Sequence, residues 1–242
     1  MLKCFSALVF VCSSAKVLKC SSDMLLAIVP AYNEEKTIGS VARGLFEHVD
    51  KVVVVDDGSV DDTLCEAQKT GAIVLRHEIN RGQGAALETG HEYARKINAD
   101  YVLHFDGDGQ FDPADISPAL RALQESGADV LFGSRFLGKQ ANIPFLKRWL
   151  VLPISKLLNY FITGSRFSDV HNGFRVITRR ALDSICITQD RMAHATEIVA
   201  QVKKHNLKYI EFPVIVWYSE YGQGGGGGLR VLRDLVMGKF VG

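Results

Sequence analysis

The sequence has no disulfide framework, no strong net charge and no long apolar run. Its five cysteines are odd in number and include no CxxC pair, which excludes a paired disulfide scaffold and a cysteine zinc site. We expect Cys65 and Cys186 to be buried thiols. A net charge of +1, without a block of Lys and Arg, gives no general attraction to nucleic acid. No uninterrupted apolar run reaches about 18 residues, so no transmembrane helix is predicted.

What the chain does contain is a regular alternation of strand and helix patterns, within 242 residues that are 47% hydrophobic. Short apolar runs predict strands at 25–30, 51–59, 72–77, 101–106 and 128–135. Apolar residues at helical spacing lie between them. This alternation predicts an α/β fold, a Rossmann-like domain with a mostly parallel central sheet and helices on both faces. Later, 172–182 predicts a strand entering a helix, 195–206 a helix, and 207–218 an edge strand because Pro213 cannot donate to a neighbour.

We divide the chain into three parts, residues 1–23, 24–220 and 221–242. The first part places an apolar run after Lys3 and is loosely similar to a signal peptide. We interpret it instead as an extension that is disordered or not native. Residues 24–220 make the α/β domain. The last part holds five consecutive glycines, Gly224–Gly228, before a predicted C-terminal helical appendage. The glycines are a loose linker or, alternatively, a lid over a bound ligand.

Polar residues follow three of the predicted strands where each strand ends. They are Tyr32-Asn33-Glu34, Asp56-Asp57-Gly58-Ser59 and Asp106-Gly107-Asp108-Gly109-Gln110. Carboxyl ends of parallel strands meet at one edge of a sheet, and ligands bind there. In an extended segment Asp106, Asp108 and Gln110 point the same way, and their hard oxygens suit Mg²⁺ or Mn²⁺. The alternative is a polar turn whose two carboxylates repel each other.

Two other interpretations of these motifs fail on particular residues, and a third, a phosphotransferase, stays open as a rival. An EF-hand loop from Asp106 needs Gly in sixth place and Glu in twelfth, where Phe111 and Ser117 stand. A dinucleotide fingerprint needs three glycines directly after a strand, and GQGAAL at 82–87 supplies two. A haloacid-dehalogenase type of phosphotransferase, which forms a phospho-aspartate, wants Thr or Val where Gln110 stands.

Six segments, in order, carry a resemblance to a known family. They are IVPAYNE at 28–34, VVVVDDGSVDDT at 52–63, NRGQGAALETG at 80–90, FDGDGQFDPADI at 105–116, GSRF at 133–136 and HNGFRVITRRAL at 171–182. Over residues 25–220 the chain resembles the family 2 glycosyltransferases, and within them the polyprenyl-phosphate or dolichyl-phosphate sugar transferases. The resemblance implies a GT-A fold, a nucleotide-diphosphate sugar donor, Mg²⁺ or Mn²⁺ as cofactor, and inverting transfer.

The resemblance also implies roles for particular residues. The implied donor-binding residues are Pro30, Tyr32, Glu34, Asp57, Gly82, Gly84, Asp106 and Arg135. The implied metal ligands are Asp106, Asp108 and Gln110, and Arg135 and Arg175 would contact phosphate or sugar. Our candidate catalytic residues are Asp108, Arg175, Asp169 and Glu197. The family often has Lys where Gln83 stands, so a positive contact to the donor is missing here.

Each of these residues also has an alternative interpretation without a ligand. Tyr32 could pack in the core, and Arg135 and Arg175 could form surface salt bridges. Asp169 and Glu197 are candidate bases for a hydroxyl acceptor, and each could equally be a carboxylate on a helix surface or cap.

The acceptor is less defined than the donor. The dolichol-type pattern ends in Arg and Gly-x-Ser-Lys, whereas YSEYGQGGGGGLR at 218–230 contains no Lys. Polyprenyl phosphate is our first interpretation, and a glycan or glycolipid hydroxyl is the alternative. A non-catalytic scaffold that binds nucleotide sugars is the alternative from another class.

The segment Ile143–Gly164 bears on location because it is apolar but interrupted by Lys147, Arg148 and Lys156. It predicts a helix in a membrane interface or, alternatively, one packed on the sheet or on a membrane protein partner. We therefore expect a cytoplasmic protein that is peripheral at the inner face of the membrane.

Overall fold

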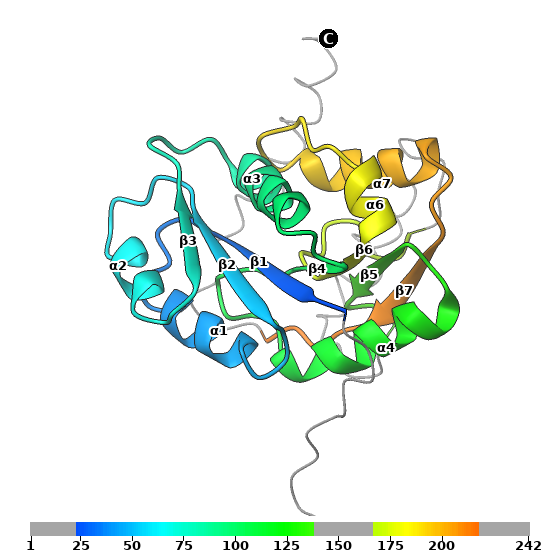
Figure 1. Ribbon diagram of the computed structural model, residues 1–242, viewed down its shortest axis with the longest axis horizontal. Helices are drawn as coiled ribbons and strands as arrows, with labels where there is room; N and C mark the ends of the chain where they lie inside the picture. The colour runs from blue at the N-terminus through cyan, green and yellow to red at the C-terminus, as the bar shows by residue number, and fades with distance from the viewer. Residues whose placement is uncertain (1–22, 138–166, 218–242) are drawn as a thin grey trace, which may run out of the picture.

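The computed structural model describes residues 23–137 and 167–217, which form a seven-stranded sheet with helices on both faces (Figure 1). The strands are β1 Leu25–Ala31, β2 Lys51–Asp56, β3 Ile73–Arg76, β4 Tyr101–His104, β5 Val130–Ser134, β6 Arg175–Thr178 and β7 Tyr209–Pro213. The helices are α1 Ile38–Leu45, α2 Thr63–Gln68, α3 Gln83–Lys96, α4 Ile116–Ser126, α6 Arg179–Ser184 and α7 His194–Lys204, with one 3₁₀ turn, η1 Pro113–Asp115.

The strand order is β3-β2-β1-β4-β6-β5-β7. Strand β6 is antiparallel to β4 and β5, and every other pair of neighbours is parallel. The predicted mostly parallel sheet and the edge position of the strand with Pro213 are therefore confirmed. The chain leaves β1 toward β2 and β3 and then returns to the other side of β1 as β4. This reversal makes the carboxyl ends of β1 and β4 the topological switch point, where open α/β sheets bind ligands.

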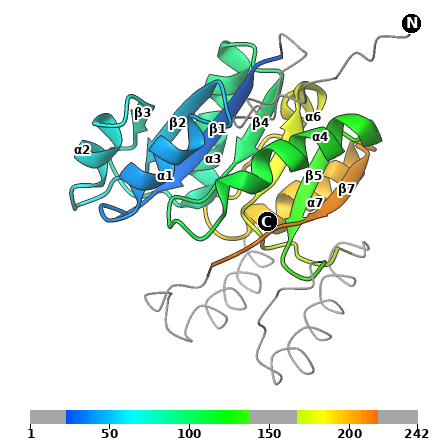
Figure 2. The same ribbon diagram turned by 90° about the horizontal axis from the view of Figure 1, so that it is seen from below.

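Both faces of the sheet are covered, which explains why its strands are almost continuously apolar. All seven residues of β1 are buried. One core cluster lies between the sheet and the helices α1, α2 and α4, and includes Ile38, Leu45 and Leu123. A second cluster lies under α3, α6 and α7 and includes Leu87 and Ile198. Figure 2 shows α1 and α4 together on one face. The predicted helices on both faces are confirmed.

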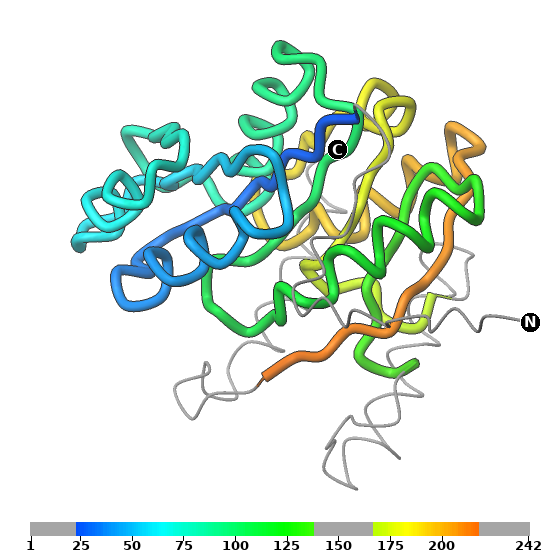
Figure 3. Tube along the Cα trace, turned by 60° about the horizontal axis from the view of Figure 1, so that its bottom comes forward, coloured from blue at the N-terminus to red at the C-terminus, as the bar shows by residue number. Residues whose placement is uncertain are grey.

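The chain beyond β7 returns to the segment that follows β4, as the Cα trace in Figure 3 shows. Phe111 and Val216 form an antiparallel bridge, and the Trp217 amide donates to the Gln110 carbonyl at 2.8 Å. Residues 214–217 therefore brace one side of the Asp-Gly segment at the switch point.

The expected burial of two thiols is wrong, because Cys65 and Cys186 are both exposed. Cys65 lies on the outer side of α2, whose buried residues are Thr63 and Ala67. Cys186 follows the end of α6 and lies outside the buried core. A short apolar residue on an amphipathic element is buried only if its position faces the sheet, which these two positions do not.

Several interpretations concern residues outside the described ranges. They are the extension at 1–23 except its last residue, the apolar segment 143–164, and the glycine run with the C-terminal helix at 221–242. Among the residues that are described, no helix has the length and apolar character needed to cross a bilayer.

Candidate functional site

The three polar clusters of the sequence meet at the carboxyl ends of β1, β2 and β4. The Asp57 amide donates to the Ala31 carbonyl at 2.9 Å, which joins the ends of β1 and β2. The Thr37 hydroxyl donates to the Gly107 carbonyl at 2.8 Å, which joins the start of α1 to the segment after β4. The convergence expected from a parallel sheet is present, and it centres on the switch point.

The Asp106–Gln110 segment is a turn, so the expectation that it is extended is wrong. Gly109 has a φ of 74°, a left-handed conformation that glycine adopts without strain. The Asp108 carboxylate accepts from the Gln110 amide at 3.0 Å and closes the turn. Asp and Gly favour such turns because Asp bonds its own backbone two residues on. The turn, rather than strand alternation, places Asp106 and Asp108 near each other.

Three carboxyl groups of this edge are difficult to ionise together. Burial and, next, the neighbouring Asp108 raise the pKa of Asp106 to about 6, while Arg175 opposes the shift. Burial also raises the pKa of Asp108. The pKa of Glu34 is raised by burial and by the charges of Asp108 and Asp61, against a hydrogen bond from Thr37. A cation would relieve this repulsion, because an opposite charge nearby favours the ionised form.

The donor set fits a divalent cation that shares its coordination with a ligand. Asp106 and Asp108 supply carboxylate oxygens, which are hard ligands. Within the described ranges, no group of three or more His, Cys, Asp or Glu side chains is arranged to hold a metal by itself. Mg²⁺ in particular binds through one or two carboxylates together with water and phosphate oxygens, so two carboxylates suffice.

Two further residues fix the position of Asp106, and the sequence did not single out either for this. The Gln83 side-chain amide donates to Asp106 Oδ1 at 2.8 Å. Gly173 lies so close that a Cβ there would overlap the Asp106 carboxylate. In the sequence, Gln83 indicates only that the lysine often found at this position in the family is missing. The available signal for Gly173 is its place in the segment HNGFRV, one residue removed from the start of β6, the strand that pairs with β4.

Gly173→Ala is expected to destabilise the protein by about 1–3 kcal/mol, because the new methyl group must displace the Asp106 carboxylate or the backbone. Gly44→Ala is the matched control. Gly44 lies in α1, where a Cβ meets only Pro113 Cγ at 3.6 Å, an ordinary contact. Alanine there should be neutral or stabilising by up to about 1 kcal/mol. Urea unfolding of both variants measures the difference, and equal stability would contradict the close approach at Gly173.

The proposed donor-binding residues line the same edge. Pro30 is buried at the end of β1, and Gly107 packs against its carbonyl. Tyr32 is 46% exposed, so the alternative that it packs in the core is wrong. Asp57 accepts from the Arg81 amide at 3.0 Å and the Gly82 amide at 2.6 Å. Asp57 thereby holds the loop before α3 onto the end of β2.

His77 strengthens this attachment and was not noticed in the sequence. Its Nδ1 is 2.7 Å from Asp57 Oδ1, and its Nε2 is 2.9 Å from the Thr89 hydroxyl. The imidazole therefore links the carboxylate at the end of β2 to helix α3. The glycine before that helix, Gly82, has a φ of 112° that side-chain-bearing residues rarely adopt.

Arg135 and Asp169 form a two-point ion pair. Arg135 Nε donates to Asp169 Oδ2 at 2.7 Å and Nη2 donates to Oδ1 at 2.8 Å. Asp169 is 5% exposed, and Asn172 donates to it at 3.3 Å. Both oxygens of Asp169 are therefore engaged, and the planar fork of Arg135 is held in one orientation.

Arg175 is buried beneath the acidic edge. It begins β6, pairs in register with His104, and is 1% exposed, so the alternative of a surface salt bridge is wrong. Its Nη2 donates to the Val170 carbonyl at 3.2 Å, and its Nε has no hydrogen-bond partner among the described residues. Burial lowers its pKa to about 10, and the charges of Asp106 and Asp169 oppose this. Arg175 is the buried positive charge of the site.

Burial and, less strongly, the charge of Arg175 lower the pKa of four histidines, which sequence spacing did not reveal as a group: His91, His104, His171 and His194. His91 Nε2 and His104 Nε2 are 2.7 Å apart in the core. Burial lowers the pKa of both rings, and the nearby charge of Arg175 adds to the effect. Burial lowers the pKa of His194 to about 4, with Arg175 as the next cause. The histidines are therefore neutral, and Arg175 supplies the charge here.

The comparisons with known proteins identify the family. Residues 26–186 match the model of Glycosyl transferase family 2. The chain belongs to this family. An uncharacterized protein of Methanocaldococcus jannaschii is 34% identical over 94% of this chain and 97% of its own length. The UDP-N-acetylglucosamine–dolichyl-phosphate N-acetylglucosaminyltransferase of Methanococcus voltae is 30% identical over 91% of this chain and 98% of its own length.

A solved structure supports the fold of this family 2 glycosyltransferase. Glucosyl-3-phosphoglycerate synthase from Mycobacterium tuberculosis, in complex with Mg²⁺ and uridine diphosphate, has a TM-score of 0.63. The two proteins are 19% identical, and the match covers 89% of this chain and 79% of the other. The resemblance inferred from the six sequence segments, the α/β GT-A-type fold and the assignment as an enzyme are confirmed.

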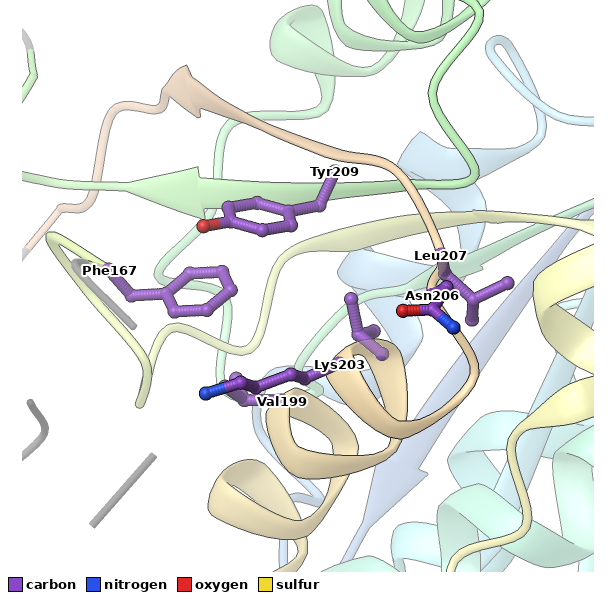
Figure 4. Close-up of a pocket in the computed structure, with 7 residues that line it drawn as sticks. Phe167, Val199, Lys203, Asn206, Leu207 and Tyr209 are labelled. Atoms are coloured by element: carbon purple, nitrogen blue, oxygen red, sulfur yellow. The ribbon is translucent and has the colours of Figure 1, made fainter. Parts of the chain in front are cut away.

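Glu197 of the glycosyltransferase lies on α7 and faces another segment. Its carboxylate accepts from the Thr188 amide at 3.1 Å and from the Gln189 amide at 2.9 Å. The glycosyltransferase also has a cavity of about 320 Å³ between α7 and β7 (Figure 4). It is lined by Phe167, Val199, Val202, Lys203, Asn206, Leu207 and Tyr209. No candidate site residue lines this cavity, so it is separate from the acidic edge.

Proposed function

We propose that this glycosyltransferase is an inverting, metal-dependent hexosyltransferase. It moves a sugar from a nucleotide-diphosphate sugar to a membrane-associated acceptor, polyprenyl phosphate. The observation that carries the proposal is the pair of neighbouring carboxyl groups of Asp106 and Asp108 at the switch point. Burial raises the pKa of both, and the charge of Asp108 adds to the shift of Asp106. The Methanococcus voltae relative, named for dolichyl phosphate, supports the class of acceptor.

The acidic edge would hold the diphosphate of the donor. Asp106, Asp108 and Gln110 would bind Mg²⁺ or Mn²⁺, whose charge offsets the negative charge that grows on the departing nucleoside diphosphate. The exposed ring of Tyr32 offers a face on which the base can stack. Glu34 and Asp57 would line the nucleotide side. The expected approach of the donor to Gly82 and Gly84 is not supported, because the Asp190 and Gln189 carbonyls occupy the space beside these glycines.

Positive charge behind the edge stabilises the leaving group. Arg175 is buried and close enough to Asp106 to lower that residue's pKa, so its charge is little screened by solvent. Arg135, which Asp169 holds in one orientation, would add a second positive charge near the phosphate oxygens. Attack by the acceptor from the face opposite the diphosphate inverts the anomeric carbon.

The engaged carboxylates favour an acceptor that is already anionic. Asp169 and Glu197, the two candidate bases, each accept several hydrogen bonds within the protein. A hydroxyl acceptor needs a base, whereas a lipid phosphate carries its charge near neutral pH. A glycan or glycolipid hydroxyl is therefore the second candidate. A lipid-phosphate acceptor would place the enzyme at the cytoplasmic face of a membrane as a peripheral protein.

The donor assignment is tested by measuring binding of uridine, guanosine and thymidine diphosphate sugars with Mn²⁺ and with a chelator. We expect one donor to bind at least about tenfold more tightly with Mn²⁺. Asp108→Asn should remove this gain, and Glu125→Gln on the exposed side of α4 should retain it. Failure of every donor to bind under both conditions would overturn the donor assignment.

The same variant separates an enzyme from a scaffold. In a transferase, Asp108→Asn should lower turnover by about 10²–10³-fold, because an electrostatic contact to the leaving group is lost. Its circular dichroism and unfolding midpoint should remain close to those of the wild type. Full binding of a donor without any transfer by the wild-type protein, with lipid phosphate or with glycan acceptors, would favour the scaffold.

A further inference from the structure

The segment Cys186–Asp190, which joins α6 to α7, is held by side chains at four successive backbone amides. The Cys186 amide donates to Gln201 Oε1 at 2.9 Å, and the Ile187 amide donates to Glu88 Oε2 at 2.7 Å. The next two amides both donate to Glu197. Backbone amides in loops more often donate to water. Here side chains of α3 and α7 accept from all four amides, so these two helices hold the segment in one conformation.

Glu197 makes the largest contribution to this arrangement. Besides the two amides, it accepts from the Thr188 hydroxyl at 2.5 Å and from the Gln201 side chain at 3.4 Å. Both carboxylate oxygens are used, and every donor is a neutral group. A carboxylate whose two oxygens are both occupied in this way orders the backbone and side chains that donate to it.

The segment in turn packs on the beginning of α3. The Asp190 carbonyl accepts from the Ala85 amide at 3.2 Å. A Cβ at Gly84 would overlap the Gln189 carbonyl, and one at Gly82 would overlap the Asp190 carbonyl. The two glycines therefore admit the 186–190 segment against the helix. Helices α3, α6 and α7 lie on the same face of the sheet, as Figure 1 shows.

The first turn of α3 leads directly to the acidic edge. Gln83 begins this helix and donates to Asp106 Oδ1 at 2.8 Å. The residue before it, Gly82, donates its amide to Asp57 at 2.6 Å. A displacement of the first turn of α3 would therefore move partners of both carboxylates at once.

We propose that Glu197 is a positioning residue that sets donor affinity through the 186–190 segment. It holds this segment on the first turn of α3, and that turn places Gln83 on Asp106 and Gly82 on Asp57. Only the effect on donor affinity rests on the proposed function. It assigns Glu197 no part in proton transfer.

Three variants that loosen the same segment provide the test. Glu197→Gln loses one acceptor oxygen, Thr188→Val loses the hydroxyl donor, and Gln201→Leu frees Cys186. Glu125→Gln on α4 is the matched control for removal of a helix carboxylate. Hydrogen exchange is measured on peptides that cover 83–90 and 185–191, which needs no ligand. Binding of uridine diphosphate with Mn²⁺, and kcat and KM with the donor identified, are measured alongside.

We expect exchange to quicken about tenfold in both peptides for all three variants and in neither for the control. Donor KM should rise about tenfold with kcat within about threefold of the wild type. Thr188→Val keeps the test decisive if Glu197→Gln fails to fold. Faster exchange at 185–191 with unchanged exchange at 83–90 would overturn the proposal. So would a collapse of kcat in Glu197→Gln alone, which is the signature of a base. Exchange that behaves as expected without any donor binding would refute the proposed function and leave the positioning role supported.

Discussion

Asp106→Asn is expected to lower sugar transfer strongly and, at the same time, to stabilise the metal-free protein at neutral pH. The pKa of Asp106 is raised from 3.8 to about 6 by burial and by Asp108, so ionising this carboxyl in the folded state costs free energy. An amide carries no such cost, and we expect a gain of about 1–3 kcal/mol in the free energy of unfolding. Transfer should fall by about 10²–10³-fold, because the carboxylate is needed to bind the cation.

The pH dependence of this gain has a definite sign. Below about pH 4 the carboxyl is protonated in both folded and unfolded wild-type protein, so the variant has no advantage. Between about pH 4 and pH 6 the unfolded chain ionises while the folded one stays protonated, and wild-type stability falls. The advantage of the amide should therefore grow over this range and stay constant above it.

Urea unfolding in the presence of a chelator, at several pH values from 4 to 8, measures this difference. Asp183→Asn is the control, because Asp183 is an exposed partner of Arg179 on α6 and its loss should change stability by about 0.5 kcal/mol or less. A variant at Asp106 that is less stable than the wild type at neutral pH would contradict the interpretation. It would mean that the hydrogen bond from Gln83 outweighs the cost of the buried charge.

The fold could be predicted because its signals are local. Strand β1 is apolar throughout, since both faces of the sheet are covered, and the alternation with helical patterns then indicates parallel neighbours. The direction of β6 could not be predicted in the same way. The residues Arg175–Thr178 have the same apolar pattern whether the strand runs parallel or antiparallel, and its pairing with β4 and β5 depends on the connection before it.

The sequence predicts where the site lies but not the geometry of its side chains. Asp106 and Asp108 were found because strand ends with paired carboxylates are visible in the sequence. Their geometry was mistaken because an Asp-Gly segment can continue a strand or form a turn, and only the φ of Gly109 and the bond to Gln110 decide. The hydrogen bond from Gln83 to Asp106 joins residues that are 23 positions apart, so no local sequence pattern predicts it.

The buried histidines show the same limit. His91 and His104 belong to α3 and β4, and each alone resembles an ordinary core or interface residue. Their contact at 2.7 Å appears only once the helix is packed on the sheet. The consequence for chemistry is indirect, since these neutral rings lie near Arg175 and leave it as the buried cation behind the acidic edge.

Arg175→Met is expected to lower transfer by about 10²–10³-fold while keeping the fold, because Met fills a similar space without the charge. The loss has an electrostatic signature. The pKa of His194, now held at about 4 by burial and by the charge of Arg175, should rise, and the pKa of Asp106 should rise further above 6 because Arg175 now lowers it. Histidine resonances followed by NMR over a pH titration measure the first shift.

Two further variants, Arg175→Lys and Arg179→Met, serve as controls for Arg175→Met. Lysine keeps the charge but loses the fork, so the pKa of His194 should stay near its wild-type value while transfer falls less than with Met. Arg179 is the next cation along the chain but pairs with Asp183 at the surface, so its replacement should change neither quantity. An unchanged pKa of His194 in Arg175→Met, or full transfer by that variant, would show that the buried arginine does not supply the charge on which leaving-group stabilisation depends.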